Sequence, residues 1–398
     1  MSEPPQCDLG PLDGIVVVDL SRALAGPQAT MMLADLGARV IKVEAPSGDE
    51  SRTWGPPFVG DADISTYFLS CNRNKESVTA DLKTSEGREL LQDLVRVADV
   101  LVENFRPGVL DRLGFSEDHL RQLNPGLVQC SLTGFGHDGP EGQRPGYDQI
   151  AQGEAGLMSL TGTPSNPTRV GVPIADLLAG MNAAFGILSA LVERAGNGRA
   201  RKVRTSLLAS VVGIHAFQGT RFTVAGQVGQ GEGNHHPAIA PYGLFRAADA
   251  PIQIACGNDG LWRRLCDVLG MDADDPELST NARRVARRRQ LTETMESVLA
   301  GASADEWLAR LSESGVPSGR VRTLDEVYGW EQTRSQGLVI EVDHPELGPI
   351  ELPGSSLRFD DNPYSGGRTD HAAPPLLGQH DESVRAWLRR TLAEEATA

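Results

Sequence analysis

The chain has 398 residues and a formal net charge of -16; 40% of its residues are apolar and 23% are charged. The length predicts two unequal domains, and the composition is that of a globular protein with a large core, which excludes disordered, collagen-like and coiled-coil proteins. The acidic balance argues against nucleic acid and anionic membranes as partners. The dense basic run 283–289 has no stacking aromatic residues beside it, so we interpret it as a solvated helix face or a subunit contact.

The sequence carries no sign of export or membrane insertion. No apolar run approaches the roughly 20 residues that a membrane-spanning helix needs, and the first residues lack the basic start and apolar stretch of a signal peptide. We therefore expect a cytoplasmic protein. His235-His236 has no third ligand at metal spacing, so no metal site is expected. The cysteines are scattered without a Cys-x-x-Cys pair, as is typical of reduced thiols: Cys7, Cys71, Cys130, Cys256 and Cys266.

Strand-like and helix-like segments alternate in the first half. Short apolar runs predict strands at 14–20, 39–44, 99–103 and 127–133, and helices are predicted at 28–36 and 87–97. Strands separated by helices of this length form βαβ units and hence a mostly parallel sheet. A long apolar helix is expected from about 177 to 194, then a strand at 201–207 and a helix to 224. This order predicts an α/β, Rossmann-like large domain.

The composition changes after residue 224. Four glycines within 226–233 are typical of a mobile loop or a domain junction. Strands at 242–247 and 251–255 are expected to pair, and helices follow through 311. The segments 316–321, 339–342 and 349–352 are interpreted as a return path, and the Pro/Gly-rich stretch 362–378 leads to a last short helix. We predict a large domain over 1–224, a smaller α+β domain over 225–329, and a return segment over 330–398 that completes the large domain.

The first strand-to-helix turn, Ser21-Arg-Ala-Leu-Ala-Gly-Pro27, stands where dinucleotide-binding proteins carry their glycine-rich turn. It contains one glycine where that fingerprint needs three, so NAD binding is not favoured. Ligands of open α/β sheets bind outside the carboxyl ends of the strands, and a ligand with several phosphates needs cationic donors there. The alternative is a set of solvated surface charges. Seven basic residues fall at or near these ends: Arg22, Lys42, Arg73, Lys75, Lys83, Arg106 and Arg112.

Asp176 stands at the start of the long apolar helix. Aspartate is a favoured N-cap residue, so a purely structural role is one interpretation. The same position suits a nucleophile, because free backbone N–H groups and the helix dipole would keep the carboxylate ionised and stabilise oxyanions formed on it. The residue types alone leave both interpretations open.

The chain resembles the family III CoA-transferases, the group that includes formyl-CoA and carnitine CoA-transferases, almost from end to end. No single motif identifies the family, but the occurrence of so many motifs in the same order does. They are Leu12-Asp-Gly14, Ala25-Gly-Pro27, Leu36-Gly-Ala38, Val40-Ile-Lys-Val-Glu44, Asn72-Arg-Asn-Lys75, Asp81-Leu-Lys83, Val102-Glu-Asn-Phe-Arg-Pro-Gly108, Gly146-Tyr-Asp148, Gly156-Leu-Met-Ser159, Thr161-Gly162, Asp176, Gly233-Asn234, Pro241-Tyr242, Gly257-Asn-Asp259 and Leu376-Leu-Gly378.

The resemblance implies that Asp176 is the catalytic aspartate. CoA would move from an acyl-CoA donor to a free carboxylic acid through an aspartyl–acyl anhydride and an aspartyl-CoA thioester. It implies that Tyr147 and Asp148 lie beside the reaction centre, with a buried turn as the alternative. It also implies an interlocked homodimer, with CoA as a substrate and no permanently bound cofactor. The implied CoA-binding residues are Arg22, Ala23, Ala25, Lys42, Asp81, Lys83, Asn104, Phe105 and Arg112.

The sequence departs from the formyl-CoA transferases around the acyl group. Leu24 replaces a glutamine, Ala175 replaces a glycine, and 177–179 lacks the usual glycines. These departures argue against formate or oxalate as the native pair. The Tyr147-Asp148 and Asn234–Tyr242 segments resemble family members that use dicarboxylates such as succinate or glutarate, which we therefore expect. The alternative on the same fold is an α-methylacyl-CoA racemase, whose histidine falls where this chain has Tyr147; a tyrosine is a poor base at neutral pH. The other alternative is a CoA-binding protein without turnover, which would not need Asp176.

Overall fold

The structure is a computed structural model that describes residues 10–360, 366–368 and 370–397. Cys7 and part of the predicted connection 362–378 lie outside the described residues. Contacts divide the chain into two compact units. Unit 1 comprises Met1–Leu157, Val170–Thr220 and Gly329–Ala398, and unit 2 comprises Met158–Arg169 and Arg221–Tyr328.

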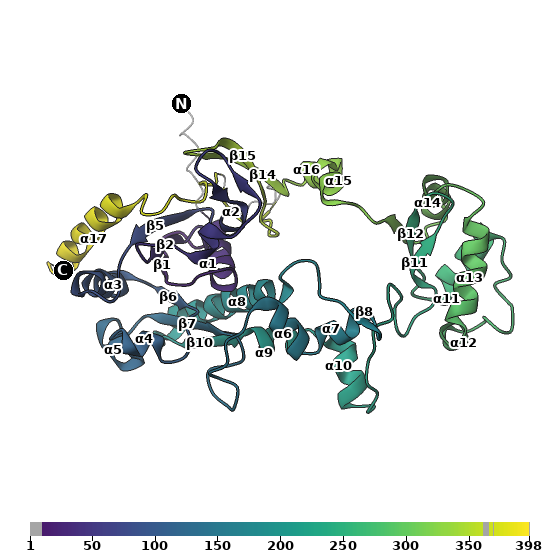
Figure 1. Cartoon of the computed structure of the whole chain (residues 1–398), viewed down its shortest axis with the longest axis horizontal. Helices are drawn as coiled ribbons and strands as arrows, with labels where there is room; N and C mark the ends of the chain where they lie inside the picture. The colour runs from purple at the N-terminus through teal and green to yellow at the C-terminus, as the bar shows by residue number, and fades with distance from the viewer. Residues whose placement is uncertain (1–9, 361–365, 369, 398) are drawn as a thin grey trace. The chain divides into compact units, whose positions relative to one another are not determined.

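Unit 1 is built on a six-stranded parallel sheet with the order β10-β7-β6-β1-β2-β5 (Figure 1). The chain runs outward from β1 through β2 and β5 on one side, and through β6, β7 and β10 on the other. The strand order therefore reverses between β1 and β6, the place where ligands of such sheets bind. The strands are β1 (Val16–Asp19), β2 (Arg39–Glu44), β5 (Lys75–Thr79), β6 (Val100–Glu103), β7 (Val128–Thr133) and β10 (Lys202–Ser206).

Helices cover both faces of this sheet. The side chains of the central strands point alternately to the two faces, and they are apolar on both. Val17 points to a core formed with α1 (Ala25–Asp35), α6 (Asp148–Glu154), α8 (Ile174–Asn197) and α9 (Leu207–Gly213). Its neighbour Val18 points to a second core formed with α3 (Ser85–Val97), α5 (Glu117–Leu123) and α17 (Asp381–Glu395). The three layers confirm the predicted α/β class with a parallel sheet.

Helix α8 is the longest helix of the described chain and extends beyond the predicted 177–194 at both ends. It lies close to α1, since a Cβ on Gly180 would come within 2.7 Å of the Ala25 carbonyl oxygen. By length and composition alone α8 could cross a membrane, but 44% of its apolar window is buried in the structure. Core helices that cover a sheet meet the same criterion, and α8 contributes to the first core.

Three local predictions need correction. Strand β5 was not predicted, because Lys75-Glu-Ser-Val-Thr79 is too polar to stand out as an apolar run. The helix predicted to reach 224 is two helices, α9 and α10 (Ala216–Thr223), which are separated at 214–215. The segment 316–321 does not belong to the return path, because β13 (Ser318–Arg320) pairs with β12 (Pro251–Ala255) in unit 2.

Unit 2 is an antiparallel sheet of β11 (Tyr242–Arg246), β12 and β13, packed against helices. The predicted pairing of 242–247 with 251–255 is confirmed. The unit has its own core, in which Trp262, Met295 and Trp307 pack on Ile252 and Ile254. The helices that form this core with the sheet are α11 (Asp259–Leu269), α12 (Asn281–Ala286), α13 (Arg288–Leu299) and α14 (Ala304–Glu313).

The basic run 283–289, interpreted above as a solvated helix face or a subunit contact, is solvated only in part: Arg283 and Arg289 are exposed, and other arginines of the run are not. Arg284 is 1% exposed: its guanidinium donates to the Ala240 and Leu278 carbonyls, pairs with Asp259 at 2.8 Å and lies over the Trp262 ring. Arg288 donates to two carbonyls, those of His236 and Pro237. Part of the run therefore holds unit 2 together.

The return segment covers the β5 edge of the sheet. Its hairpin of β14 (Val339–His344) and β15 (Gly348–Pro353) is followed by α17. The Asn74 N–H donates to the Ala372 carbonyl and the Asn74 side chain accepts from the Ala372 N–H. Further along β5, the His380 N–H donates to Ser77, and Asp381 accepts from the Thr79 N–H. An edge whose backbone groups are occupied in this way is protected from pairing with other chains.

The remaining elements are short. They are η1 (Glu50–Thr53), β3 (Phe58–Val59), β4 (Ile64–Ser65), α2 (Thr66–Ser70), α4 (Val109–Arg112), α7 (Leu157–Leu160), β8 (Gly162–Thr163), β9 (Asn166–Pro167), α15 (Leu324–Gly329) and α16 (Glu331–Ser335).

Candidate active site

Asp176 lies inside the first turn of α8, not at its cap. The N-cap residue is Pro173, which offers no side-chain acceptor. The capping acceptor instead comes from α6: Asp148 Oδ1 accepts from the N–H of Ala175 at 2.8 Å and from the N–H of Asp176 at 3.4 Å. The interpretation of Asp176 as a cap is therefore wrong, because a carboxylate distant in sequence already satisfies the helix end.

The Asp176 carboxylate accepts no hydrogen bond from the part of the chain that the structure describes. Burial raises the pKa of this carboxyl group to about 7, and the negative charge of Asp148 adds to the rise. Burial therefore opposes the expected effect of the helix dipole, which favours the ionised carboxylate. A partly buried, unpaired carboxylate is a poorly solvated base and a better nucleophile than one in water.

Tyr147 and Asp148 differ in their surroundings. Tyr147 immediately precedes α6 and its side chain is 60% exposed in this chain. Asp148 is held by Gln152, whose Nε2 donates to Asp148 Oδ2 at 2.7 Å. Gln152 is fully buried and its amide oxygen accepts from the Val170 N–H. Asp148 is thus held in place at the start of α8. Of the two residues, it is Asp148 and not the Tyr147 side chain that lies next to Asp176.

Tyr67 was missed by sequence reasoning and lies in the same region. It packs with Leu24 and Leu177, the residue after Asp176, and stacks edge-on against Trp54 with ring centroids 4.8 Å apart. Burial raises the pKa of its phenol, and the nearby charge of Asp176 raises it further. The phenol thus stays a proton donor. Tyr67 belongs to the short helix α2, whose sequence carries no catalytic motif that could have indicated it.

We expect Tyr67→Phe to lower kcat by between about tenfold and a hundredfold, the range for losing one hydrogen bond to a charged group. The phenol is suited to donate to the carboxylate or to an oxyanion formed on it. Steady-state kinetics with Tyr328→Phe as the matched control measure the effect. An unchanged kcat in both variants would assign Tyr67 a packing role only.

The implied CoA residues of the first turn are held against β6. Asn104 accepts from the Arg22 N–H at 2.9 Å and donates to the Arg22 carbonyl at 2.8 Å. The Arg22 guanidinium lies 5.1 Å from the centre of the Phe105 ring, in cation–π range. Ala23 adopts the left-handed conformation with φ of 64°. These residues lie where the strand order reverses between β1 and β6.

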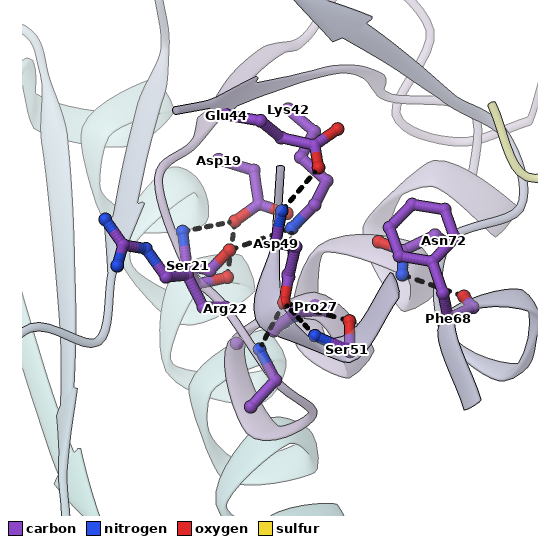
Figure 2. A network of polar contacts seen from close by, with 12 residues as sticks. Asp19, Ser21, Arg22, Pro27, Lys42, Glu44, Asp49, Ser51, Phe68 and Asn72 are labelled. Carbon is purple, nitrogen blue, oxygen red and sulfur yellow. Dashed lines mark hydrogen bonds and ion pairs between the residues drawn. The ribbon is translucent and has the colours of Figure 1, made fainter. Parts of the chain in front are cut away.

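Behind this turn is a buried network of charges, shown in Figure 2. Lys42 is 1% exposed; its ammonium donates to the Ser21 carbonyl at 2.9 Å and to Asp49 at 2.8 Å. Burial would lower the pKa of Lys42, but Asp19, Asp49 and Glu44 outweigh it and raise the pKa. The ammonium therefore stays charged and faces the protein interior rather than the surface.

The other implied CoA residues follow β5 and β6. Asp81 accepts from the Lys83 N–H at 3.0 Å and so shapes the turn after β5. The side chains of Lys83 and Arg112 are exposed and have no ion-pair partner within the described ranges. Ala25 is buried at the start of α1, and its N–H has no acceptor among the described residues. The nine residues thus lie at the carboxyl ends of the four adjacent strands β6, β1, β2 and β5, in α4 after β6 or at the start of α1.

Two further basic residues of this half are internal. Lys75 is buried, donates to Asp19 at 3.2 Å, and has a pKa lowered by burial. Arg73 is buried against Asp35 at 2.5 Å. Neither is available to a ligand in this structure. Arg106 is exposed and lines a cavity of about 210 Å³ beside β6 and β7. The sequence alone cannot show which of these basic residues are buried. The carboxylate partners of Lys75 and Arg73 are distant in the chain and are brought next to them only by the fold.

No group of three potential metal ligands occurs among the residues described. His236 instead stacks on Tyr242, with ring centroids 5.2 Å apart.

The chain belongs to CoA-transferase family III, whose family model matches residues 12–381, and it is therefore a CoA-transferase. This confirms the resemblance seen in the sequence.

Curated relatives of similar length carry CoA-transferase names. The chain is 38% identical to succinyl-CoA:glutarate CoA-transferase of Homo sapiens over 96% of this chain and 87% of that protein. It is 38% identical to succinate–glutarate CoA-transferase of Agrobacterium fabrum, with 97% and 98% covered. It is 39% identical to acetyl-CoA:oxalate CoA-transferase of Acetobacter aceti, with 94% and 95% covered.

Solved structures share the fold. A CAIB/BAIF family protein from Brucella suis superposes with a TM-score of 0.84 at 40% identity, over 96% of this chain and 100% of that chain. A protein from Mycobacterium tuberculosis gives a TM-score of 0.83 at 32% identity, over 94% and 99%.

Proposed function

We propose that this enzyme moves CoA from succinyl-CoA to a dicarboxylic acid, with Asp176 as the nucleophile. The observation that supports this most is the Asp176 carboxylate itself, which is partly buried, accepts no hydrogen bond from the described residues and has a pKa of about 7. A structural carboxylate would be paired or solvated. A carboxylate that is largely desolvated and has no partner is suited to covalent catalysis.

The chemistry balances without ATP. An Asp176 oxygen attacks the thioester carbonyl and expels CoA thiolate, which leaves an aspartyl–acyl anhydride. The thiolate then attacks the aspartyl carbonyl, releases the acid and forms an aspartyl-CoA thioester. The acceptor carboxylate repeats these two steps in reverse order, so one thioester is exchanged for another. The oxyanion forms on the acyl oxygen of the substrate in the first step and on an aspartyl oxygen of Asp176 in the second, and in this proposal the Tyr67 phenol donates to the aspartyl oxygen.

We infer that CoA lies along the carboxyl ends of β6, β1, β2 and β5. The exposed cations Arg22, Lys83 and Arg112 are suited to its phosphates, and the Phe105 ring is suited to stack on its adenine. CoA binds as a substrate and is released in each turnover. No resident cofactor is needed for this chemistry.

The dicarboxylate preference rests on the relatives and on the acyl pocket. Relatives named for succinyl-CoA and glutarate align over nearly the whole chain. Leu24, 4% exposed, packs with Tyr67 and Leu177 beside the reaction centre. This apolar wall is suited to the methylene groups of succinate or glutarate better than to formate, which has none.

The test is covalent trapping. The enzyme is incubated with succinyl-CoA and hydroxylamine, which converts an aspartyl anhydride or thioester to a stable hydroxamate, and peptides are analysed by mass spectrometry. We expect a mass shift on the peptide that contains Asp176, and glutaryl-CoA formation when glutarate is added. Deuterium uptake at the α-carbon of a branched acyl-CoA without a mass shift would instead support a racemase.

We also propose that the protein is a cytoplasmic homodimer. The four described cysteines are free thiols, which suits a reducing compartment. One face of α8 leaves Met181, Phe185 and Val192 exposed by 49%, 73% and 74% in the single chain. Apolar side chains in this number on one helix face are typical of a surface that a second copy covers.

Phe185→Asp should therefore shift the protein toward a monomer, because it places a charge in that apolar contact. Light scattering coupled to size exclusion measures the mass. A wild-type protein that is already monomeric at the same concentration would contradict the dimer.

A further inference from the structure

Two buried carboxylates contact the first turn from behind (Figure 2): Asp19 accepts from the Ser21 N–H at 2.9 Å, and Asp49 contacts the turn further along. Asp49 follows β2, is 2% exposed and caps η1. Its Oδ1 accepts a hydrogen bond from the Ala23 N–H at 3.2 Å. The same oxygen accepts from the N–H and from the hydroxyl of Ser51, each at 2.9 Å. Its Oδ2 accepts from Lys42 Nζ at 2.8 Å, and the same ammonium donates to the Ser21 carbonyl at 2.9 Å. Asp49 and Lys42 thus hold the turn on both sides of Arg22, at Ser21 and at Ala23.

The turn needs these supporting contacts because of the backbone conformation of Ala23. Its φ of 64° lies in the left-handed region, which is unfavourable for a residue with a Cβ. The N–H that Ala23 donates to Asp49 is a charge-assisted bond, stronger than a neutral one. Arg22, the residue before it, is fixed on the opposite side by Asn104. Side chains outside the turn therefore support its conformation: Asp19 of β1, Asp49 after β2 and Asn104 after β6.

The charges behind the turn are constant over the working pH range. Burial would raise the pKa of Asp49, but Lys42 and the hydrogen bonds from Ser51 and Ala23 hold it below its usual value. Asp19, a further carboxylate whose charge acts on Lys42, also keeps a lowered pKa, because Lys75, Lys42 and the hydrogen bonds from Ser21 and Thr30 outweigh its burial. The contacts that hold the turn therefore do not depend on a change in the charge of Asp49 or Asp19.

We propose that Asp49 is a positioning residue for CoA binding: it holds Ala23 in the left-handed conformation and, through Lys42, holds Ser21, so that Arg22 is presented to the substrate. This inference rests on the proposed function, in which the turn binds CoA. It also assigns Lys42 a different task from the one the resemblance implies. Lys42 acts on the turn through Ser21 and Asp49, and not on a phosphate.

Two substitutions separate this role from simple capping of η1. Asp49→Asn keeps an oxygen that reaches both Ser51 and Ala23. Asp49→Ser keeps a hydroxyl that caps η1, but is too short to reach Ala23 or Lys42. We expect Asp49→Ser to raise KM for succinyl-CoA about tenfold, the factor that 1.4 kcal/mol represents, with kcat changed far less. Asp49→Asn should raise KM clearly less than Asp49→Ser.

Asp35→Asn is the matched control for stability. Asp35 is buried and pairs with Arg73, so its loss also leaves a buried cation without its partner, at the far end of α1 from the turn. It should lower Tm as the Asp49 variants do, with KM for succinyl-CoA unchanged. Equal KM values in Asp35→Asn and Asp49→Ser, or a loss in kcat without a change in KM, would overturn the inference.

Ala23→Gly in the Asp49→Ser background tests the strain directly. Glycine adopts the left-handed conformation without a Cβ penalty, so the double variant should recover part of the lost affinity relative to Asp49→Ser. No recovery would mean that Asp49 does not act through Ala23. Asn104→Ala tests the underlying site: if it also leaves KM for succinyl-CoA unchanged, the turn does not bind CoA and the proposed site is wrong. If it raises KM while Asp49→Ser does not, only the role of Asp49 is wrong.

Discussion

Asp176→Asn should abolish CoA transfer while making the protein more stable. The amide cannot form the anhydride, so we expect kcat to fall by at least about a thousandfold, as for loss of a covalent nucleophile. The folded-state pKa of Asp176, about 7, lies above the 3.8 of the free side chain. Between these two values the folded protein holds a proton that the unfolded chain has lost, so stability falls as pH rises. The wild type should therefore lose up to about 1.4 kcal/mol per pH unit relative to the variant across that window.

Thermal melts at several pH values and activity assays check both parts of this result. Glu193→Gln, at the other end of α8 and on the surface, is the control and should alter neither. An inactive Asp176→Asn that is less stable than the wild type at pH 8 would point to a structural carboxylate instead. Transfer that survives the substitution would rule out Asp176 as the nucleophile.

Asp148→Asn should shift the acid limb of the pH–rate profile to lower pH. Asp148 contributes a negative charge that raises the pKa of Asp176, second to burial. The asparagine oxygen can still accept from the Ala175 N–H, so the start of α8 stays capped. Without the charge, Asp176 ionises at lower pH and becomes a weaker nucleophile. We therefore expect relatively more activity below pH 6 and a lower plateau above pH 8.

Glu154→Gln removes the same charge from the far end of α6, where Glu154 is exposed and paired with Arg144. It should leave the profile in place. A profile that stays fixed in Asp148→Asn as well would mean that the acid limb reports a group other than Asp176. A shift to higher pH would contradict the electrostatic argument outright.

The main elements of unit 1 could be predicted because they depend on local patterns. The apolar run at 39–44 is β2, with the same bounds, and the long apolar helix is α8. The Lys75–Thr79 strand could not be found this way, since two of its five residues are charged and its outer edge is covered by residues from the distant end of the chain. The segment 316–321 was misplaced because a short strand carries no information about which sheet it joins.

Less of the candidate site could be predicted from the sequence, because the properties of its side chains depend on neighbours that are distant in the chain. Asp148 lies 28 residues from Asp176, and only the fold places it at the start of α8. The raised pKa of Asp176 follows from that neighbour and from burial, and neither is a property of a motif. Lys42 shows the same limitation: a lysine at a strand end is a plausible phosphate ligand until its buried carboxylate partner is known.

The covering of β5 by the return segment has a consequence for synthesis on the ribosome. Asn74 and Ala372, which exchange hydrogen bonds at this edge, are 298 residues apart. Translation adds about 5 to 20 residues per second, so β5 leaves the ribosome tens of seconds before its cover. During that interval the nascent sheet has an open edge next to the strands that carry the proposed CoA site. We expect nascent chains that end before residue 370 to depend on chaperones, and the completed chain to be released from them.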